Sequence, residues 1–198
     1  MLTKRIGIYA GTFDPVHAGH MAFALQALEA ATLDEIYFMP ERRPRHRANV
    51  EHFAHRVAML KQATLPYKHF GVIESVDVSF SVKRTLPMLK QKFKGAQLVF
   101  LFGSDAVGGL PDWPYAAQLL QNSELVIAAQ AGKDTTELQA AMASWPVQPQ
   151  AAVMLTSFAP AVSSSIIREA LRARQPVPGL LQSVARYSNR HWLYVSFR

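Results

Sequence analysis

The chain switches repeatedly between two patterns of apolar and polar positions. Compact apolar runs bounded by Gly, Pro or polar residues are typical of buried strands, whereas longer stretches with apolar positions three and four apart are typical of amphipathic helices. Six short runs match the first pattern: KRIGIYA (4–10), DEIYFMP (34–40), HFGVIE (69–74), AQLVFLFG (96–103), SELVIAA (123–129) and AAVMLT (151–156).

Helical periodicity fills the segments between these runs and after the last of them. Pro87 falls inside one helical segment and must lie near its start or bend it. The final WLYVSFR (192–198) fits either an edge strand or a docked tail. The predicted helices are HMAFALQALEAA (20–31), VEHFAHRVAMLKQA (50–63), SVKRTLPMLKQKF (81–93), YAAQLLQN (115–122), TTELQAAMASW (135–145), SSSIIREALRAR (163–174) and PGLLQSVARYSN (178–189).

Strands separated by helices predict a parallel sheet with helices on both faces, because each crossover must be long and right-handed. We find no internal repeat, low-complexity tract or change of composition within the chain. The expected fold is therefore α/β: one Rossmann-like, doubly wound domain over residues 1–198, closed by a C-terminal helical segment.

The composition is that of a globular protein. The 198 residues are 49% hydrophobic and 18% charged, a balance that buries a sizeable core. The absence of Cys excludes a disulfide framework, a thiolate nucleophile and a thiolate metal site. No apolar run is long enough to cross a bilayer and the first residues do not form a secretory signal, so we expect a cytoplasmic protein without membrane contact.

The chain is basic, with 21 Lys and Arg against 14 acidic residues and a formal charge of +7. Such a charge attracts anions, including nucleotides, polyphosphates and nucleic acid. A solvated basic surface that improves solubility explains the charge equally well, and charge alone does not decide between them.

The most specific chemistry follows the first predicted strand, in GTFDPVHAGH (11–20). Gly11 permits a sharp turn and close approach to a ligand, Asp14 is a possible helix cap, and Gly19 leaves room beside the next turn. The helix start behind them presents free N–H groups and a partial positive charge to an anion. His17 and His20, three apart, are expected to project side by side as donors to that anion.

Alternative roles for the two histidines fit less well. The stretch lacks both GxGxxG and GxxxxGK[ST]. A zinc site needs a third ligand and a supporting shell that the sequence does not offer. A single His is usually structural, but a pair flanking a glycine at a strand-to-helix turn favours phosphate chemistry.

GTFDPVHAGH resembles the HxGH signature of the nucleotidyltransferase superfamily and, as [GS]xFDPxHxGH, the nicotinate/nicotinamide-mononucleotide adenylyltransferases. Further likenesses follow in order along residues 6–194. FAHRVAML (53–60) is similar to the helix after the family's second strand, and FGSDAVGGLPDW (102–113) to its GxD with a downstream tryptophan. VSSSIIR (162–168) resembles ISSTxIR, and VARYSNRHWLY (184–194) resembles the closing VxxYIxxHxLY.

The resemblance implies direct transfer of AMP from ATP to a pyridine mononucleotide, with Mg²⁺ held mainly by the ATP phosphates. It implies three catalytic residues, His17, His20 and Arg168. It implies that the mononucleotide contacts Asp14, Thr85 and Trp113. The ATP-binding residues that it implies are Gly11, Thr12, Phe13, Gly19, Arg47, Gly103, Asp105, Ser163, Ser164 and Ser165.

Several of these residues are equally compatible with ordinary structural roles. The three serines at 163–165 form a helix N-cap, and Arg168 lies in the first turn, where a cation opposes the helix dipole unless something negative is near. Asp105 is able simply to cap a helix, and Trp113, between two prolines, to pack rather than stack on a ligand. The basic loop ERRPRHR (41–47), which contains Arg47, has the composition of a solvated loop.

Two departures from the family pattern concern the pyridine site. SFSVKRTL (79–86) has one residue more than the family's SYTxxTL before its threonine. After SELVIAA, where acid-specific members carry an Arg, this chain has QAGK (130–133). The choice between the acid and amide mononucleotides therefore stays open.

Two rival functions remain. One is an adenylyl- or cytidylyltransferase for another phosphomonoester such as phosphopantetheine, which Trp113 and the C-terminal motif disfavour. The other is a non-catalytic nucleotide- or RNA-binding relative, which is disfavoured because both histidines and Arg168 are present. We expect no nucleic-acid partner, and the sequence specifies no oligomeric state.

Overall fold

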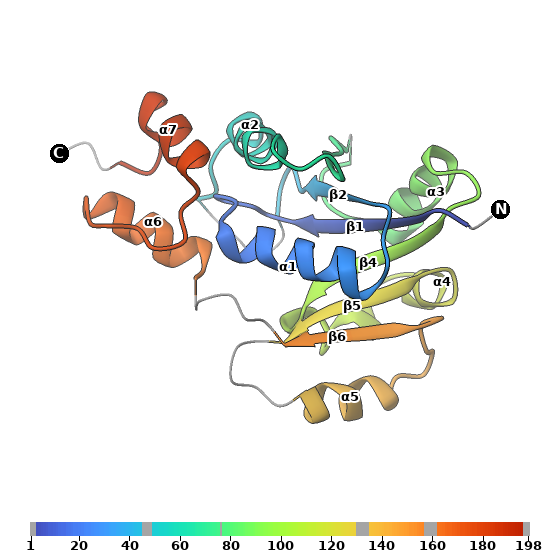
Figure 1. Ribbon diagram of the computed structural model, residues 1–198. Coiled ribbons are helices and arrows are strands. Elements are labelled where there is room, and N and C mark those ends of the chain that lie inside the picture. Colours follow the sequence, from blue (N-terminus) through green and yellow to red (C-terminus); the bar gives the residue numbers. More distant parts are fainter. Residues whose placement is uncertain (1–2, 45–48, 76, 130–134, 157–161, 196–198) are drawn as a thin grey trace.

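A computed structural model describes residues 3–44, 49–75, 77–129, 135–156 and 162–195 (Figure 1). Six parallel strands form one sheet in the order β3-β2-β1-β4-β5-β6. The strands are β1 (Arg5–Gly11), β2 (Glu35–Pro40), β3 (Phe70–Val72), β4 (Gln97–Gly103), β5 (Glu124–Ala129) and β6 (Ala152–Thr156).

Helices connect the strands and close the chain. Two short 3₁₀ helices, η1 (Ser104–Ala106) and η2 (Leu110–Asp112), follow β4 and were not predicted. The α-helices are α1 (Ala18–Ala30), α2 (Phe53–Thr64), α3 (Val82–Lys92), α4 (Ala116–Gln121), α5 (Thr135–Ala143), α6 (Ser164–Arg172) and α7 (Gln182–Arg190).

The predicted fold class is confirmed, and the differences are local. Pro87 lies in the second turn of α3, which continues to Lys92. The tail is docked: Leu193 and Tyr194 are buried, and the described part, up to Val195, forms no strand. The predicted helix 135–145 stops at Ala143, and Trp145 packs into the core beyond its end.

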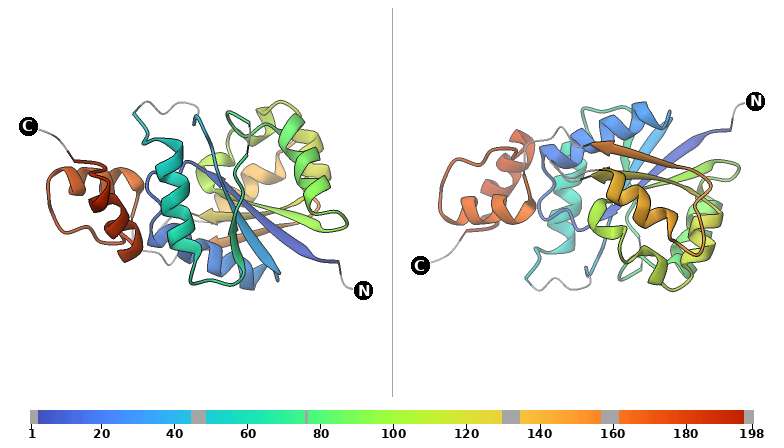
Figure 2. Two further views of the ribbon diagram at one scale, coloured as in Figure 1. Left: turned by 90° about the horizontal axis from the view of Figure 1, so that it is seen from above. Right: turned by 90° about the horizontal axis from the view of Figure 1, so that it is seen from below.

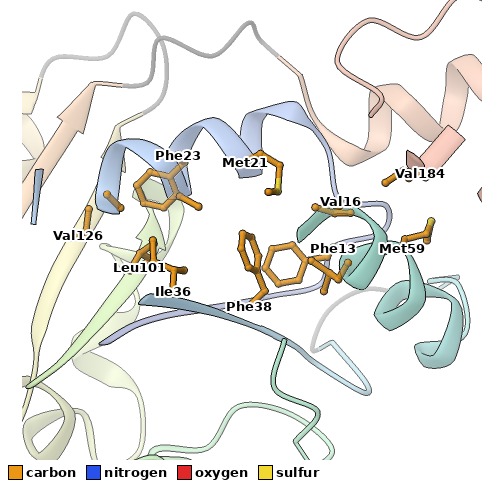
Figure 3. Close-up of a cluster of buried hydrophobic side chains, with 14 of the residues drawn as sticks. Phe13, Val16, Met21, Phe23, Ile36, Phe38, Met59, Leu101, Val126 and Val184 are labelled. Atoms are coloured by element: carbon orange, nitrogen blue, oxygen red, sulfur yellow. The ribbon is translucent and has the colours of Figure 1, made fainter. Parts of the chain in front are cut away.

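Two apolar cores lie on opposite faces of the sheet. One joins α1, α2 and α7 to alternate strand positions and includes Phe13, Phe38 and Val184 (Figure 3). The other joins α3, α4 and the end of α5 to the remaining positions, among them Ile6, Ile8 and Phe100. Burial on both faces explains why the strands are nearly continuous apolar runs.

The sheet order places the functional edge. β1 pairs with β2 on one side and with β4 on the other, so the order reverses at the carboxyl ends of β1 and β4, where ligands bind in such sheets. Helices α6 and α7 lie beyond these carboxyl ends (Figures 1 and 2). Among the described residues, no helix has the length and apolar character needed to cross a membrane.

Candidate active site

The loop after β1 takes its shape from Phe13 rather than from a glycine. Phe13 has φ 49°, a left-handed conformation that is unfavourable for a bulky side chain, and its ring is buried in the core. Gly11 is needed for space, because a Cβ there would come within 3.0 Å of the Phe13 ring. The sharp turn expected at Gly11 thus lies two residues later, and any ligand contact of Phe13 must use its backbone.

The N-cap of α1 is His17, so the cap expected at Asp14 is wrong. The His17 backbone N–H donates to His20 Nδ1 at 3.2 Å, which ties the two residues across the first turn. Their rings lie side by side, with centroids 3.6 Å apart and planes 33° apart. The predicted parallel projection of the two imidazoles is confirmed, and Gly19 lies between them in that turn.

His17 is an uncharged histidine near neutral pH. The residue is 6% exposed, and burial lowers its pKa to about 4. Its Nδ1 is buried and has no hydrogen-bond partner among the residues that the structure describes. The buried side of the ring faces the His20 backbone N–H in a capping-box arrangement, so Nε2 is the ring nitrogen left to meet a ligand.

The start of α6 docks directly on this loop. Ser163 caps α6 as predicted, since its hydroxyl accepts from the Ile166 N–H at 3.2 Å. The Ser164 hydroxyl donates to the Pro15 carbonyl at 3.0 Å. Two segments about 150 residues apart in sequence, the starts of α1 and α6, are therefore held side by side.

Arg168 completes the contact between the two helix starts. Its Nη1 donates to the Asp14 carbonyl at 2.6 Å and lies 3.8 Å from the Asp14 carboxylate, and its Nη2 donates to the Ser165 hydroxyl at 3.3 Å. Its side chain is 18% exposed. The structure thus brings the histidines and Arg168 to one corner of the molecule, at the carboxyl end of β1.

The Asp14 carboxylate is already hydrogen-bonded within the protein, in part to the C-terminal tail. Its carboxylate accepts from the Tyr194 hydroxyl at 2.7 Å and from the Glu51 N–H at 3.3 Å, and the residue is 1% exposed. Burial first, and then the Asp14 charge and hydrogen bond, raise the pKa of Tyr194, which keeps the phenol protonated as the donor. Asp14 serves here to position the loop, and its predicted contact with the mononucleotide stays a prediction.

Gly103 and Asp105 lie at the carboxyl end of β4, beside the first loop. A Cβ on Gly103 would come within 2.5 Å of the Asp105 Oδ1, so glycine lets the carboxylate fold back over the strand end. Asp105 is exposed in η1, whose N-cap is Gly103. Burial, and next the Asp105 charge, raise the pKa of Tyr9 in β1.

A pocket of about 460 Å³ opens on the α3 side of the same edge of the sheet. Trp113 lines it and packs against Phe80 (centroids 5.9 Å apart) and Phe102 (5.8 Å). The pocket walls therefore combine aromatic faces with charged groups, a surface suited to a flat ring that carries a polar substituent. The other lining residues are Glu41, Ser81, Val82, Lys83, Asp112, Pro114 and Tyr115.

Thr85 supports this pocket from below. It is fully buried, and its hydroxyl accepts from the Ser81 N–H at 3.1 Å, which fixes the first turn of α3. Ser81, and not Thr85, is among the lining residues. Thr85 acts on the pocket through Ser81, and its predicted direct contact with the mononucleotide stays a prediction.

Some predicted residues lie outside the described residues. Arg47, the residue matched to the family's gating lysine, is one of them, as is the 130–133 segment that lacks the expected Arg. Among the described residues, no group of three or more His, Asp or Glu side chains is arranged to hold a metal ion.

The sequence-based prediction missed Arg56. It is completely buried in α2 and donates hydrogen bonds to three carbonyls, including that of Thr12 in the first loop. The sequence contained a signal for the burial of Arg56. This residue follows Phe53 by three positions and precedes Leu60 by four, which places it on the face of the helix turned to the core.

The chain is similar to a family of enzymes over nearly its whole length. Residues 8–170 match the family model described as cytidylyltransferase-like. A nicotinate-nucleotide adenylyltransferase of Bacillus subtilis (strain 168) is 33% identical, and the match covers 98% of this chain and 100% of the relative. A probable nicotinate-nucleotide adenylyltransferase of Clostridium perfringens (strain 13 / Type A) is 30% identical, covering 93% and 97%.

Solved structures agree on the fold. Plasmodium falciparum nicotinic acid mononucleotide adenylyltransferase complexed with NaAD superposes with a TM-score of 0.76 at 17% identity, covering 96% of this chain and 97% of that one. The same enzyme complexed with APC gives the same score and coverage at 16% identity. By the identity and coverage of its relatives, the chain belongs to the nicotinate-nucleotide adenylyltransferases, within the cytidylyltransferase-like family.

Proposed function

We propose that the protein transfers AMP from ATP to the phosphate of nicotinate mononucleotide, releasing pyrophosphate and forming the dinucleotide used in NAD biosynthesis. The observation that carries this proposal is the convergence of two helix starts, α1 with its two histidines and α6 with Arg168, on one corner. Two helix N-termini and a guanidinium together form a site for a chain of phosphates.

The reaction needs no covalent intermediate on the protein. An oxygen of the mononucleotide phosphate attacks the α-phosphorus of ATP, a new P–O bond forms there, and the bond to pyrophosphate breaks. The protein then lowers the barrier by aligning two anions that repel each other and by stabilising charge on the transferring group. His17, His20 and Arg168 are the donors in this proposal.

His17 is neutral in the free protein and donates a ring N–H to the phosphates when they bind. Its lowered pKa, about 4, leaves the imidazole uncharged near neutral pH until an anion arrives. A polyphosphate close to the ring favours the imidazolium and therefore raises that pKa on binding. Arg168 is already oriented by its hydrogen bond to the Asp14 carbonyl.

The other ATP contacts follow from the position of the two loops. Backbone N–H groups and hydroxyls are offered to the phosphates by the loop after β1 (11–13), by Gly19 and by the three serines at 163–165. Gly103 and Asp105 lie at the strand end where the ribose is expected, and Arg47 is proposed for the gating loop. Trp113 is proposed to stack on the pyridine ring in the aromatic pocket.

Mg²⁺ is proposed to arrive bound to ATP. The described residues are compatible with this arrangement. They include no cluster of three carboxylate or imidazole ligands, and Asp14, the buried carboxylate in the loop after β1, is already hydrogen-bonded. When bound, the ion neutralises phosphate charge and holds most of its own waters.

The acid mononucleotide is the preferred substrate in this proposal, because the named relatives are nicotinate-nucleotide enzymes. Lys83 lines the pocket and offers a cation for the nicotinate carboxylate. We place the activity in the cytoplasm, consistent with a chain that contains no Cys.

One assay tests the proposal. Purified protein is incubated with ATP, Mg²⁺ and either nicotinate or nicotinamide mononucleotide, and pyrophosphate release is followed. Turnover with the acid at a kcat/KM at least about 10-fold above the amide is expected. Turnover of the amide alone rejects the acid assignment, and no turnover of either rejects the function.

A further inference from the structure

Arg56 is a buried cation whose hydrogen bonds all go to the main chain. It lies in the first half of α2 and is 0% exposed. Its Nη1 donates to the Thr12 carbonyl at 2.7 Å, its Nη2 to the Arg42 carbonyl at 3.0 Å, and its Nε to the Glu51 carbonyl at 2.9 Å. Each guanidinium nitrogen therefore holds a different stretch of backbone.

Burying such a cation is unfavourable for the stability of the fold. Burial lowers the pKa of Arg56, and the charges of Asp14, Glu41 and Glu51 only partly oppose this effect. None of the carboxylates that the structure describes lies within 4.0 Å as an ion-pair partner of Arg56. A buried charge without a direct counter-charge is unfavourable, so its fixed geometry is its most evident contribution.

The three carbonyls belong to the segments that border the active site. Thr12 precedes Phe13, and the Thr12 carbonyl is part of the peptide that leads into the left-handed Phe13 backbone. Arg42 follows the end of β2, and Glu51 precedes α2 and donates its own N–H to the Asp14 carboxylate. One side chain therefore fixes the first loop relative to both described ends of the connection between β2 and α2.

We propose that Arg56 is a positioning residue for adenylyl transfer, which holds the loop after β1 in its unfavourable conformation so that the phosphate donors stay aligned. This inference rests on the proposed function. A rigid guanidinium fork is required, because the single ammonium of lysine does not span three carbonyls that lie in different directions. Loss of the fork lets the first loop relax, which misaligns the reacting groups without removing the charges that bind ATP.

The test compares Arg56→Lys with a matched change, Arg5→Lys. Arg5 is also a guanidinium fork, bonded to the Ala31 carbonyl and to Glu124, but it is only partly buried and lies at the opposite end of β1. We expect Arg56→Lys to lower kcat by about 10- to 100-fold, with KM for both substrates changed by less than about 3-fold. Arg5→Lys should lower the melting temperature and leave kcat unchanged.

Hydrogen exchange gives a second readout that does not depend on catalysis. In Arg56→Lys, the amides of the 11–20 peptide should exchange faster, while those of β4 (97–103) keep their protection. A structural role alone predicts faster exchange in both peptides and a loss of kcat that follows the folded fraction. That result, or normal kcat with normal exchange in the 11–20 peptide, overturns the proposal.

A milder variant keeps the proposal testable if Arg56→Lys does not fold. Phe53→Leu removes the ring that packs 5.6 Å from the Arg56 guanidinium and 4.4 Å from that of Arg42, and it leaves both charges in place. It should change kcat and loop exchange in the same direction by a smaller factor, and unchanged values reject the inference. If the wild-type protein shows no turnover, the proposed function fails, whereas the exchange comparison still decides the role of Arg56.

Discussion

The two ends of the parallel sheet differ in how their buried polar and charged groups are paired. Beside the amino end of β1, two cations face carboxylates: Arg5 forms a two-pronged pair with Glu124, and Lys4 pairs with Glu35 at 2.7 Å. At the carboxyl ends, Arg168 lies 3.8 Å from the Asp14 carboxylate, but Arg56 has no such partner and His17 has an unpaired buried nitrogen among the described residues.

Positive φ angles occur at both ends, because Thr32, with φ 49°, precedes the amino end of β2. Two of the residues that border the carboxyl-end sites are bulky aromatics, Phe13 in the loop after β1 and Tyr115 in the aromatic pocket. Features that weaken a fold persist where they contribute to function. The comparison indicates that changes at the amino ends will alter stability, whereas changes at the carboxyl ends will alter catalysis first.

The largest effect is expected from His20. His20→Ala removes one preorganised donor from the proposed phosphate site at the starts of α1 and α6. Such a loss typically lowers the rate by about 100- to 1,000-fold, which is about 3 to 4 kcal/mol of transition-state stabilisation. Stability should change far less, because His20 is half-buried and its replacement removes the hydrogen bond from the His17 N–H. Steady-state pyrophosphate release and a thermal melt measure the two effects.

His69 provides the matched histidine control. It lies next to the amino end of β3, where its Nδ1 is 2.9 Å from the Asp34 carbonyl. His69→Ala should keep wild-type turnover. Equal losses of activity in both variants would contradict the division between the two ends of the sheet.

The second effect concerns stability and pH. The pKa of His17 falls from 6.5 to about 4 on folding, so between these values the unfolded chain binds more protons than the folded one. The free energy of unfolding therefore decreases by up to about 3 kcal/mol as the pH falls from about 6.5 to 4. Above pH 6.5 His17 is neutral in both the folded and the unfolded chain, and this loss is absent. Urea unfolding of the wild type and His17→Gln across this range isolates the contribution.

The variant has no imidazole at this position and should lack that part of the slope. If wild type and His17→Gln lose stability in parallel between pH 6.5 and 4, the buried neutral state of His17 is wrong. Activity is not used in this comparison, because His17 belongs to the proposed catalytic corner.

The sequence predicted the sheet and the pairing of the two histidines because both depend on local patterns, whereas the role of Arg168 beside them was expected from the family resemblance. Apolar runs marked the strands, and the spacing of His17 and His20 in the first turn was enough to place their rings together. The N-cap at Ser163 was predicted for the same reason, since it depends on neighbouring residues.

Contacts between distant segments could not be predicted from local patterns. The hydrogen bond from Tyr194 to Asp14 joins residues 180 positions apart, and no local pattern specifies it. The turn was assigned to Gly11 because glycine is the usual residue for such conformations, but tertiary packing imposes it on Phe13 instead. Arg56 was overlooked because a lone arginine in an amphipathic helix normally faces solvent.

The third effect tests the amino end. Glu124→Gln removes the carboxylate charge that faces Arg5, whose pKa is raised mainly by this hydrogen bond. Both side chains are partly exposed, so the loss should be limited to about 1 to 2 kcal/mol, or a melting temperature lower by about 2 to 8 °C. The kcat should stay at the wild-type value, and a fall of 10-fold or more would contradict the comparison.

The smallest effect is expected in the aromatic pocket. Trp113→Phe keeps a ring among Phe80 and Phe102 but reduces the face offered to a pyridine. Aromatic pairs contribute about 0.5 to 1.5 kcal/mol, so KM for the mononucleotide should rise by about 2- to 10-fold while KM for ATP stays constant.

Trp145 is the matched control for Trp113, because it is buried in the same core on that face of the sheet but is absent from the pocket lining. Trp145→Phe should lower the melting temperature and leave both KM values unchanged. A selective rise in the mononucleotide KM for Trp113→Phe alone means that Trp113 contacts the substrate, whereas equal behaviour of the two variants means that it only packs.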